Sequence, residues 1–310
     1  MTKKPRKPAL TCAALAAVLL LTYLVAPIFG SFGQPQIKVE QSMAANAAVN
    51  QSGGGLVVLG DSIASGYGLN EKSQSYGFLL ADAMQMDNNY CNLAYNGATS
   101  HDLLNVLAQP ENAGTVGGAS IVLISIGGND IIHPAMSILK EQFSLPADST
   151  GEQICDYFKN NLSQLEALEN IVSNPVLQLK MFNAMADFAK NFKEITTTVR
   201  QINPTAEICV QTIYNPFSGA GELDGLSPMV DIIMGSMNHI IKKEAENSGF
   251  YVADIFTEFS GKAKLYTNIQ SFDIHPNALG HTTIFDDVYE VITGSQYFPQ
   301  KINNKVIDNF

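Results

Sequence analysis

The sequence predicts an α/β fold built on a mainly parallel sheet, and three observations support this prediction. The chain has 310 residues, 46% hydrophobic and 15% charged, which is enough apolar material for a large core and excludes a disordered or fibrous protein. Short, wholly apolar runs recur along the chain, as is typical of strands buried on both faces. Helical patterns separate these runs, and such alternation is typical of parallel strands joined by helices.

The strands and helices of this α/β pattern are expected in alternation along the chain. The expected strands are residues 56–59, 90–94, 120–126, 206–213 and 250–255, of which the second is the weakest. The expected helices are residues 76–86, 100–108, 229–247 and 277–292.

Residues 141–201 interrupt the alternation with two or three amphipathic helices. Their apolar residues recur at helical spacing, as in Phe182, Met185, Phe188, Ala189 and Phe192. We expect a helical insertion that packs over one end of the sheet.

The amino-terminal segment, residues 1–29, has the features of an exported or anchored protein. Four basic residues precede residues 9–29, a stretch of 21 residues without a charge, and such a stretch can reach across a bilayer at ~1.5 Å per residue. The segment is therefore either a signal peptide, with small residues at 45–47 as a cleavage site, or a retained membrane tether. Both alternatives place the rest of the chain outside the cell or at its surface.

The remaining boundaries follow from composition. Residues 30–55 lack apolar periodicity and are rich in Gly, Gln, Ser, Asn and Ala, which predicts a flexible linker. The folded domain is expected over residues 56–295, followed by a C-terminal tail at residues 296–310. The sequence gives no indication of an oligomeric state.

Charge and cysteine content exclude several classes of partner and cofactor. The net charge is −11, and beyond the amino-terminal segment the basic residues show no local patch, which argues against nucleic acid as a partner. Cys91, Cys155 and Cys209 lie apart without CxxC spacing, so they permit at most one disulfide and show no zinc pattern. No metal or cofactor is therefore expected.

Polar motifs follow several of the expected strands directly. Functional sites of parallel sheets lie at this position, just beyond the carboxyl ends of the strands. The first strand leads into Asp61 and Ser62, the second into Gly97, and the third into Asn129. His275 precedes the last helix. A serine attacks a carbonyl when a base removes its proton and hydrogen-bond donors meet the developing oxyanion, and these loops offer all of those groups.

The ordered set of motifs, Gly60-Asp61-Ser62, Gly97, Gly128-Asn129-Asp130 and His275, resembles the GDSL-type serine hydrolases of the SGNH superfamily. The resemblance extends from about residue 56 to residue 292. It implies a three-layer α/β/α fold of the flavodoxin-like kind, with a central five-stranded sheet. It also implies that Ser62 is the nucleophile and His275 the base. The oxyanion donors would be the backbone N–H of Ser62, the N–H of Gly97 and the side chain of Asn129.

One position departs from this family pattern. The family places the acid of the triad three residues before the base, where this chain has Phe272, while Asp273 is only two residues before His275. Asp273 can bend back to the imidazole from a turn, or a backbone carbonyl can orient the ring and leave a Ser62–His275 dyad. Asp273 can also be a turn-capping residue before the helix that begins near Pro276. We expect the orienting role.

The resemblance implies an extracellular esterase or lipase that hydrolyses carboxylic esters of small molecules, lipids or polysaccharides. Two alternatives are a carbohydrate O-deacetylase of the same superfamily and a surface-tethered binding module without catalysis. Apolar residues of the insertion, such as Phe158 and Phe182, either line an acyl groove or belong to the core, and helical spacing favours the core. The G-x-S-x-G, P-loop, G-x-G-x-x-G and H-E-x-x-H motifs of other enzyme classes are absent, and residues 66–68, Gly-Tyr-Gly, are interpreted as a flexible turn.

Overall fold

A computed structural model describes residues 54–149, 153, 157, 161, 175–221, 224, 227–271 and 273–294. The predicted leader at residues 1–29, all but the end of the linker at 30–55 and the tail at 296–310 lie outside these residues. Within the described ranges, no helix is both long enough and apolar enough to cross a membrane.

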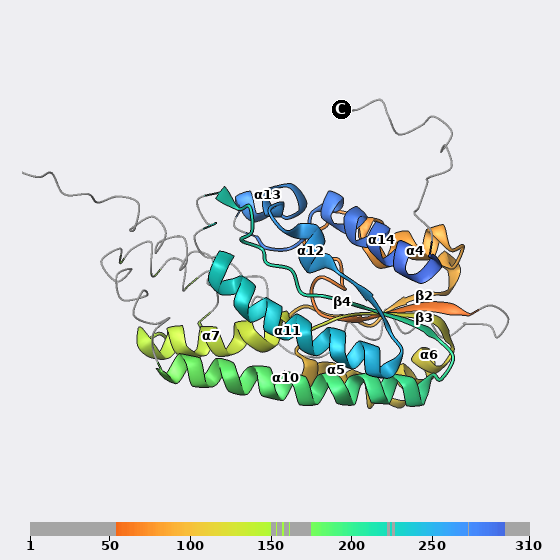
Figure 1. Cartoon of the computed structure of the whole chain (residues 1–310), viewed down its shortest axis with the longest axis horizontal. Helices are drawn as coiled ribbons and strands as arrows, with labels where there is room; N and C mark the ends of the chain where they lie inside the picture. Colours follow the sequence, from red (N-terminus) through yellow and green to blue (C-terminus); the bar gives the residue numbers. More distant parts are fainter. Residues whose placement is uncertain are drawn as a thin grey trace, which may run out of the picture.

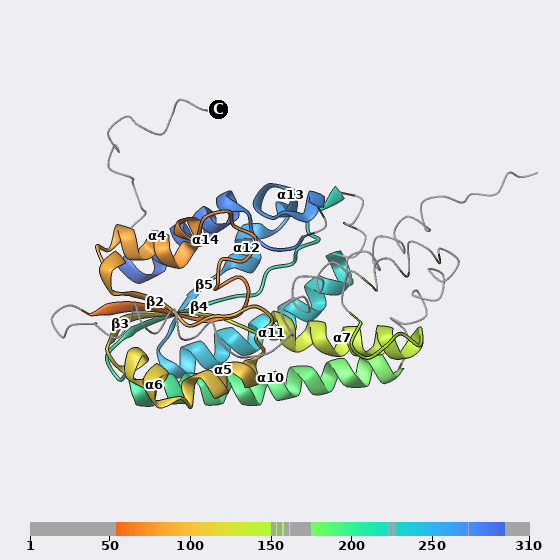
Figure 2. The same ribbon diagram turned by 180° about the vertical axis from the view of Figure 1, so that it is seen from behind.

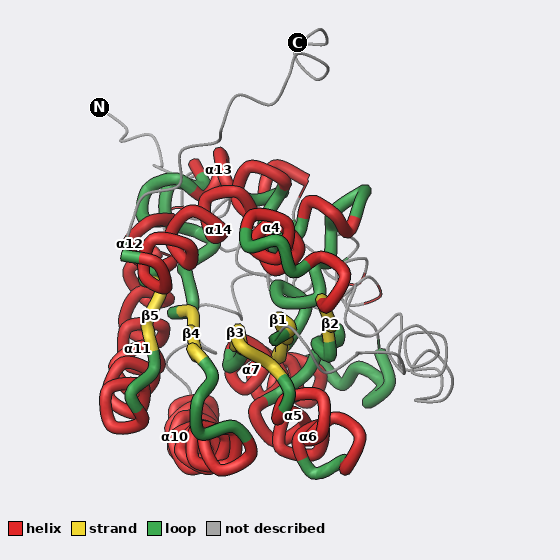
Figure 3. The backbone as a smooth tube through the Cα atoms, turned by 90° about the vertical axis from the view of Figure 1, so that its right-hand side faces the viewer, coloured by secondary structure: helices red, strands yellow, loops and turns green. Residues whose placement is uncertain are grey.

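The centre of the molecule is a five-stranded sheet in which every neighbouring pair of strands is parallel. Its strands are β1 (Gly55–Gly60), β2 (Tyr90–Asn92), β3 (Ala119–Ser125), β4 (Glu207–Gln211) and β5 (Tyr251–Ala253). Their order is β2-β1-β3-β4-β5, seen nearly end-on in Figure 3. All five expected strands are confirmed, and so is the predicted α/β class with its parallel sheet.

Helices cover both faces of the sheet and make the fold three-layered (Figures 1 and 2). One layer contains α4 (Tyr76–Ala83), α12 (Ile255–Phe259), α13 (Ala263–Tyr266) and α14 (Ala278–Thr293). The other contains α5 (Ser100–Leu107), α6 (Pro110–Gly117), α7 (Gly128–Gln142), α10 (Pro175–Ile202) and α11 (Ser227–Ser248). Short 3-10 helices lie at η1 (Lys72–Gln74), η2 (Asp87–Asn89) and η5 (Ile269–Ser271).

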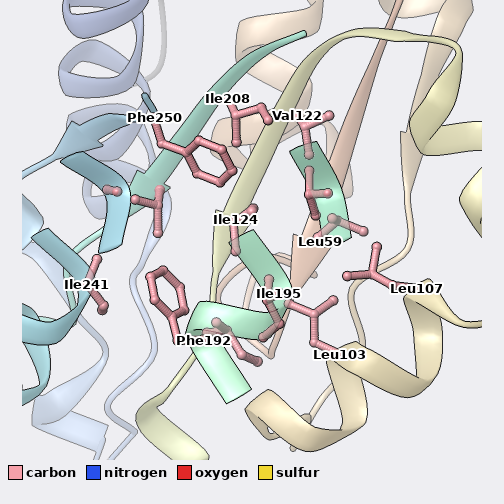
Figure 4. Packing of buried hydrophobic residues seen from close by; sticks show 14 of the residues in the cluster. Leu59, Leu103, Leu107, Val122, Ile124, Phe192, Ile195, Ile208, Ile241 and Phe250 are labelled. Atoms are coloured by element: carbon pink, nitrogen blue, oxygen red, sulfur yellow. The ribbon is translucent and has the colours of Figure 1, made fainter. Parts of the chain in front are cut away.

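Two hydrophobic cores, one on each face of the sheet, hold the layers together. Side chains alternate along β1, so that Val57 and Leu59 enter the core beneath α5 and α10 while Leu56 and Val58 enter the core beneath α4 and α14. Figure 4 shows the first core, in which helix residues such as Phe192 pack against strand residues such as Ile124. Strands buried on both faces explain why their sequences are continuous apolar runs.

Helix α10 corrects the prediction of an insertion over one end of the sheet. Phe188, Phe192, Ile195 and Val199 are fully buried in the core beneath the sheet, so this half of α10 is part of the covering layer. These apolar residues recur every three or four positions, so they lie on one face of α10, and this face packs along the sheet. Phe182 is 65% exposed and is therefore not in the core as favoured above. Phe158 lies outside the described residues.

Candidate active site

The candidate site lies at the carboxyl ends of β1 and β3. The chain order changes direction between these strands, because β1 is flanked by β2 on one side and β3 on the other. In open parallel sheets, such a switch point leaves a crevice for ligands between the loops that leave the two strands. Ser62 follows β1 and Asn129 follows β3, so both lie at this crevice.

Backbone hydrogen bonds hold Ser62 in a tight turn after β1. Gly60 takes a φ of +137°, and a Cβ at this position would lie 1.9 Å from Ser125 O, so only glycine lets the chain leave the strand here. The N–H of Tyr67 donates to Ser62 O at 2.9 Å and closes the turn. Ser62 is thereby held at the crevice end of the sheet, where the residue is only 6% exposed.

Asp61 stabilises the turn that holds Ser62. One carboxylate oxygen accepts the N–H of Ile63 at 3.0 Å. Burial raises the pKa of Asp61 to about 7, and the nearby charge of Asp130 adds to the rise although backbone hydrogen bonds oppose it.

His275 lies next to Ser62 although the two are far apart in the chain. Ser62 Oγ and His275 Nε2 are 2.9 Å apart, so with the ring proton on Nδ1 the serine hydroxyl donates to Nε2. His275 is only 2% exposed. A serine that donates to a buried imidazole has the arrangement that nucleophilic catalysis requires.

Asp273 faces the other nitrogen of the same imidazole. Its Oδ1 lies 2.5 Å from His275 Nδ1 and also accepts the backbone N–H of His275 at 3.0 Å. Burial alone would raise the pKa of Asp273, but the hydrogen bonds and charge of His275 outweigh it and lower the pKa. The carboxylate is therefore ionised and contacts Nδ1 rather than serving only to cap the following helix, which is capped by Asn277 instead.

The predicted oxyanion donors lie on two loops that contact each other. Gly97 adopts a φ of +79°, which favours glycine at the turn after β2. Asn129 Nδ2 donates to Ala98 O at 2.9 Å, so its amide lies against the Gly97 turn and retains a second proton for a ligand. Asp130 accepts both the N–H and the hydroxyl of Ser100, which ties the Asn129 loop to the start of α5.

A further contact joins the nucleophile turn to the Gly97 loop. Ser65 Oγ donates to Asn96 Oδ1 at 2.7 Å and also lies 3.0 Å from Ser62 O. Ser62, Gly97, Asp273 and His275 thus lie on loops and Asn129 lies in the first turn of α7, all in segments that contact one another. The sequence did not predict the Ser65–Asn96 contact, because neither residue stands out from ordinary turn composition.

The interpretation of residues 66–68 as only a flexible turn is wrong. Gly66 and Gly68 both have positive φ and fold the chain back, and the ring of Tyr67 packs on the imidazole of His275 with ring centroids 4.6 Å apart. A Cβ on Gly68 would lie 3.4 Å from His275 Cβ, in close contact with the loop. The signal in the sequence was the pair of glycines flanking an aromatic residue.

His281, Cys91 and Cys209 make none of the contacts described above. His281 is fully buried and stacks on Tyr76 with ring centroids 5.9 Å apart. Cys91 and Cys209 are buried, and no disulfide joins the two. Cys155 lies outside the described residues.

Comparisons with known proteins agree with this geometry. The model of the GDSL-like lipase/acylhydrolase family matches residues 58–283, well over half of the chain. The chain belongs to this family. A relative in Bacillus subtilis (strain 168), the uncharacterized protein YpmR, is 25% identical over 247 residues, which make up 76% of this chain and 80% of the relative.

Solved structures of GDSL-type enzymes share the fold. Phospholipase A1 from Streptomyces albidoflavus NA297 aligns with a TM-score of 0.55 at 20% identity over 77% of this chain and 100% of its own. The extracellular lipase of Streptomyces rimosus gives a TM-score of 0.54 at 18% identity, with the same coverage of 77% and 100%. An acetyl xylan esterase from Geobacillus stearothermophilus gives 0.50 at 15% identity, covering 80% of this chain and 98% of its own. These likenesses show the three-layer α/β fold of the GDSL-type hydrolases.

Proposed function

We propose that this GDSL-family protein hydrolyses carboxylic esters through an acyl-enzyme on Ser62. The observation that supports the proposal is the continuous contact from Ser62 Oγ through the His275 imidazole to the Asp273 carboxylate, with distances of 2.9 and 2.5 Å. In the first half-reaction, His275 Nε2 takes the Ser62 proton while Oγ attacks the ester carbonyl carbon. His275 then protonates the alcohol as it leaves, and the acyl group remains on Ser62.

Water completes the reaction by the same route. His275 takes a proton from water, the hydroxide attacks the acyl carbon, and the proton returns to Ser62 as the acid leaves. In both halves the oxyanion accepts hydrogen bonds from the backbone N–H groups of Ser62 and Gly97 and from the free amide proton of Asn129. Loss of one side-chain donor of this kind costs ~100–1,000-fold in kcat, so Asn129 is assigned to catalysis.

The first testable prediction concerns the nucleophile. Ser62→Ala removes one oxygen from a loop at the edge of the sheet, so we expect an unchanged fold and the loss of ester hydrolysis by more than ~1,000-fold. The measurement is the release of chromophore from aryl esters of increasing acyl length, with circular dichroism as the check on folding. A residual rate within ~10-fold of the parent would overturn the assignment. A parent with no hydrolysis of any ester would favour the non-catalytic binding module.

The same ester panel distinguishes the two substrate classes. Structural neighbours include a phospholipase and an acetyl xylan esterase, and the shared catalytic residues do not select between long-chain lipid esters and acetylated polysaccharides. Hydrolysis that extends to long acyl chains favours the esterase or lipase function. Release of acetate from acetylated polymer, with poor cleavage of longer chains, favours the O-deacetylase.

We also propose that the enzyme acts outside the cytoplasm. The basic residues ahead of the uncharged stretch at 9–29 support export, with the stretch either removed or retained as a tether. Mass spectrometry of the protein from membrane and medium fractions separates the two forms. Recovery of the full-length chain from the cytoplasm alone would contradict the proposal.

A further inference from the structure

The peptide group between Ile274 and His275 is held at both ends. Its N–H, the backbone N–H of His275, donates to Asp273 Oδ1 at 3.0 Å. Its carbonyl, Ile274 O, accepts the hydroxyl of Tyr214 at 2.5 Å. Tyr214 comes from a distant part of the chain, just after β4.

We propose that Tyr214 is a positioning residue whose hydroxyl fixes this peptide group and thereby aims the Asp273 carboxylate at His275 Nδ1. The proposal rests on the proposed function, because it assigns Tyr214 a part in orienting the base. The Tyr214 hydroxyl donates to the Ile274 carbonyl and its ring packs on Phe259, so its effect on the imidazole passes through the Ile274–His275 peptide and Asp273.

The planarity of the peptide links the two hydrogen bonds. A peptide group moves as a rigid plane, so fixing the Ile274 carbonyl also fixes the direction of the His275 N–H. That N–H and Nδ1 share a single carboxylate oxygen, Asp273 Oδ1. If the plane turned, the oxygen would lose one of its two donors and the carboxylate would leave the imidazole.

The short spacing between the acid and the base explains why the peptide group before His275 must be held in place. Only Ile274 separates Asp273 from His275, so the Asp273 side chain must turn back along the chain to reach Nδ1. Asn268 holds the groups on either side: its backbone carbonyl accepts the N–H of Asp273 at 3.2 Å, and its backbone N–H donates to His275 O at 3.0 Å. The carbonyl between them depends on Tyr214.

Tyr214 is itself well anchored. It is 4% exposed, and its ring packs on the fully buried Phe259 with ring centroids 4.7 Å apart. The preceding residue, Ile213, exchanges two hydrogen bonds with the Asn238 side chain at 2.7 and 2.8 Å. Burial raises the pKa of Tyr214 well above its usual range, which favours the protonated hydroxyl that donates to Ile274 O.

The test is Tyr214→Phe, which removes the hydroxyl and keeps the ring on Phe259. We expect kcat to fall ~10–50-fold with KM within ~2-fold, because the substrate-binding surface is untouched while the base is misaligned. Tyr266→Phe is the matched control. Its ring also packs on Phe259, at 5.0 Å, and no hydrogen bond joins its hydroxyl to a described residue, so we expect kcat within ~2-fold of the parent.

Two readouts separate positioning from a merely structural role. In an Asp273→Asn background, Tyr214→Phe should cost less than a further ~2-fold in kcat, because the group through which it acts is already gone. The second readout needs no turnover: the low-field NMR resonance of the proton between His275 Nδ1 and Asp273 should be present in the parent and in Tyr266→Phe, and shifted or lost in Tyr214→Phe.

An unmoved Nδ1 resonance in Tyr214→Phe overturns the proposal, as does a kcat loss that is equally large in the Asp273→Asn background. If Ser62→Ala leaves hydrolysis intact, the proposed function fails, but the resonance still decides whether Tyr214 orients Asp273. A shifted resonance together with a non-additive kcat loss supports both.

Discussion

At the scale of single residues, the contact between Asp273 and His275 determines which imidazole nitrogen carries the proton. Oδ1 of Asp273 holds the Nδ1 proton, so Nε2 is free to accept from Ser62. The spacing of two residues is accommodated because Asp273 Oδ1 reaches both the backbone N–H and Nδ1 of His275, while Tyr214 donates to the carbonyl of the intervening Ile274. The site therefore has the connectivity of a triad, although the acid lies one position closer to the base than the family pattern places it.

The Asp273→Asn variant tests this connectivity. The amide keeps the shape of the loop but favours the wrong imidazole tautomer, so we expect kcat/KM to fall by ~1,000–10,000-fold with the midpoint of denaturant unfolding nearly unchanged. Steady-state kinetics on the ester that the parent cleaves fastest provide the measurement. A loss of only a few-fold would show that a backbone carbonyl orients His275 and would remove Asp273 from the mechanism.

At the scale of elements, the start of α7 fixes where Asn129 lies. Gly127 caps this helix with a φ of +121°, and a Cβ there would lie 2.7 Å from the Phe188 ring and 2.9 Å from Ile213. We expect Gly127→Ala to lower the free energy of unfolding by ~1–3 kcal/mol, since strain and overpacking add, and to lower kcat as Asn129 shifts. Denaturant unfolding and ester kinetics measure the two effects.

Gly114→Ala is the matched control for this prediction. Gly114 lies in the middle of α6, is exposed, and has no atom within 4 Å of an added Cβ. Alanine there should raise the free energy of unfolding by up to ~1 kcal/mol, because it favours the helix. Equal effects of the two substitutions would show that Gly127 is not conformationally required.

The elements also show what sequence reasoning predicts well. The five strands were predicted because burial of the sheet on both faces makes their sequences largely apolar. Ser62, Gly97 and Asn129 each follow a strand, as predicted, because parallel strands deliver the segments after them to one edge of the sheet. The layer position of α10 was missed, since Phe182 and Phe188 satisfy the same helical spacing but only Phe188 is buried. The contact of Tyr214 with Ile274 spans 60 positions and has no periodic signal, so only the folded chain shows it.

At the scale of the whole molecule, the buried ionisable groups set how stability responds to acid. Burial lowers the pKa of His281 to about 3. Below about pH 6.5, His281 therefore binds a proton in the unfolded chain but stays neutral in the folded chain. This contribution to stability falls by ~1.4 kcal/mol per pH unit as pH drops from ~6.5 toward ~3. Asp61 and Asp130, whose pKa values burial raises to about 7 and about 6, act in the opposite direction, since their folded forms retain protons that the unfolded chain releases.

Because these contributions oppose one another, the effect of His281 is measured as the difference in free energy of unfolding between the parent and a His281 variant. We expect His281→Gln to be less stable than the parent at pH 7.5, because the stacking on Tyr76 and the hydrogen bond from its N–H are lost. The deficit should shrink by ~1.4 kcal/mol per pH unit below about pH 6. Urea unfolding of both proteins at several values between pH 4 and pH 7.5 measures it. A deficit independent of pH would contradict the burial of a neutral imidazole.

The distance along the chain between Ser62 and His275 affects the order in which the site forms during synthesis. The two are 213 positions apart, and the helix that follows His275, α14, packs on α4, the helix that follows Ser62. A chain that emerges amino end first displays its serine long before its histidine. Until His275 has been synthesised, the Ser62 hydroxyl has no imidazole to take its proton. Docking of α14, the last helix of the described part of the chain, therefore accompanies the contact between Ser62 and His275.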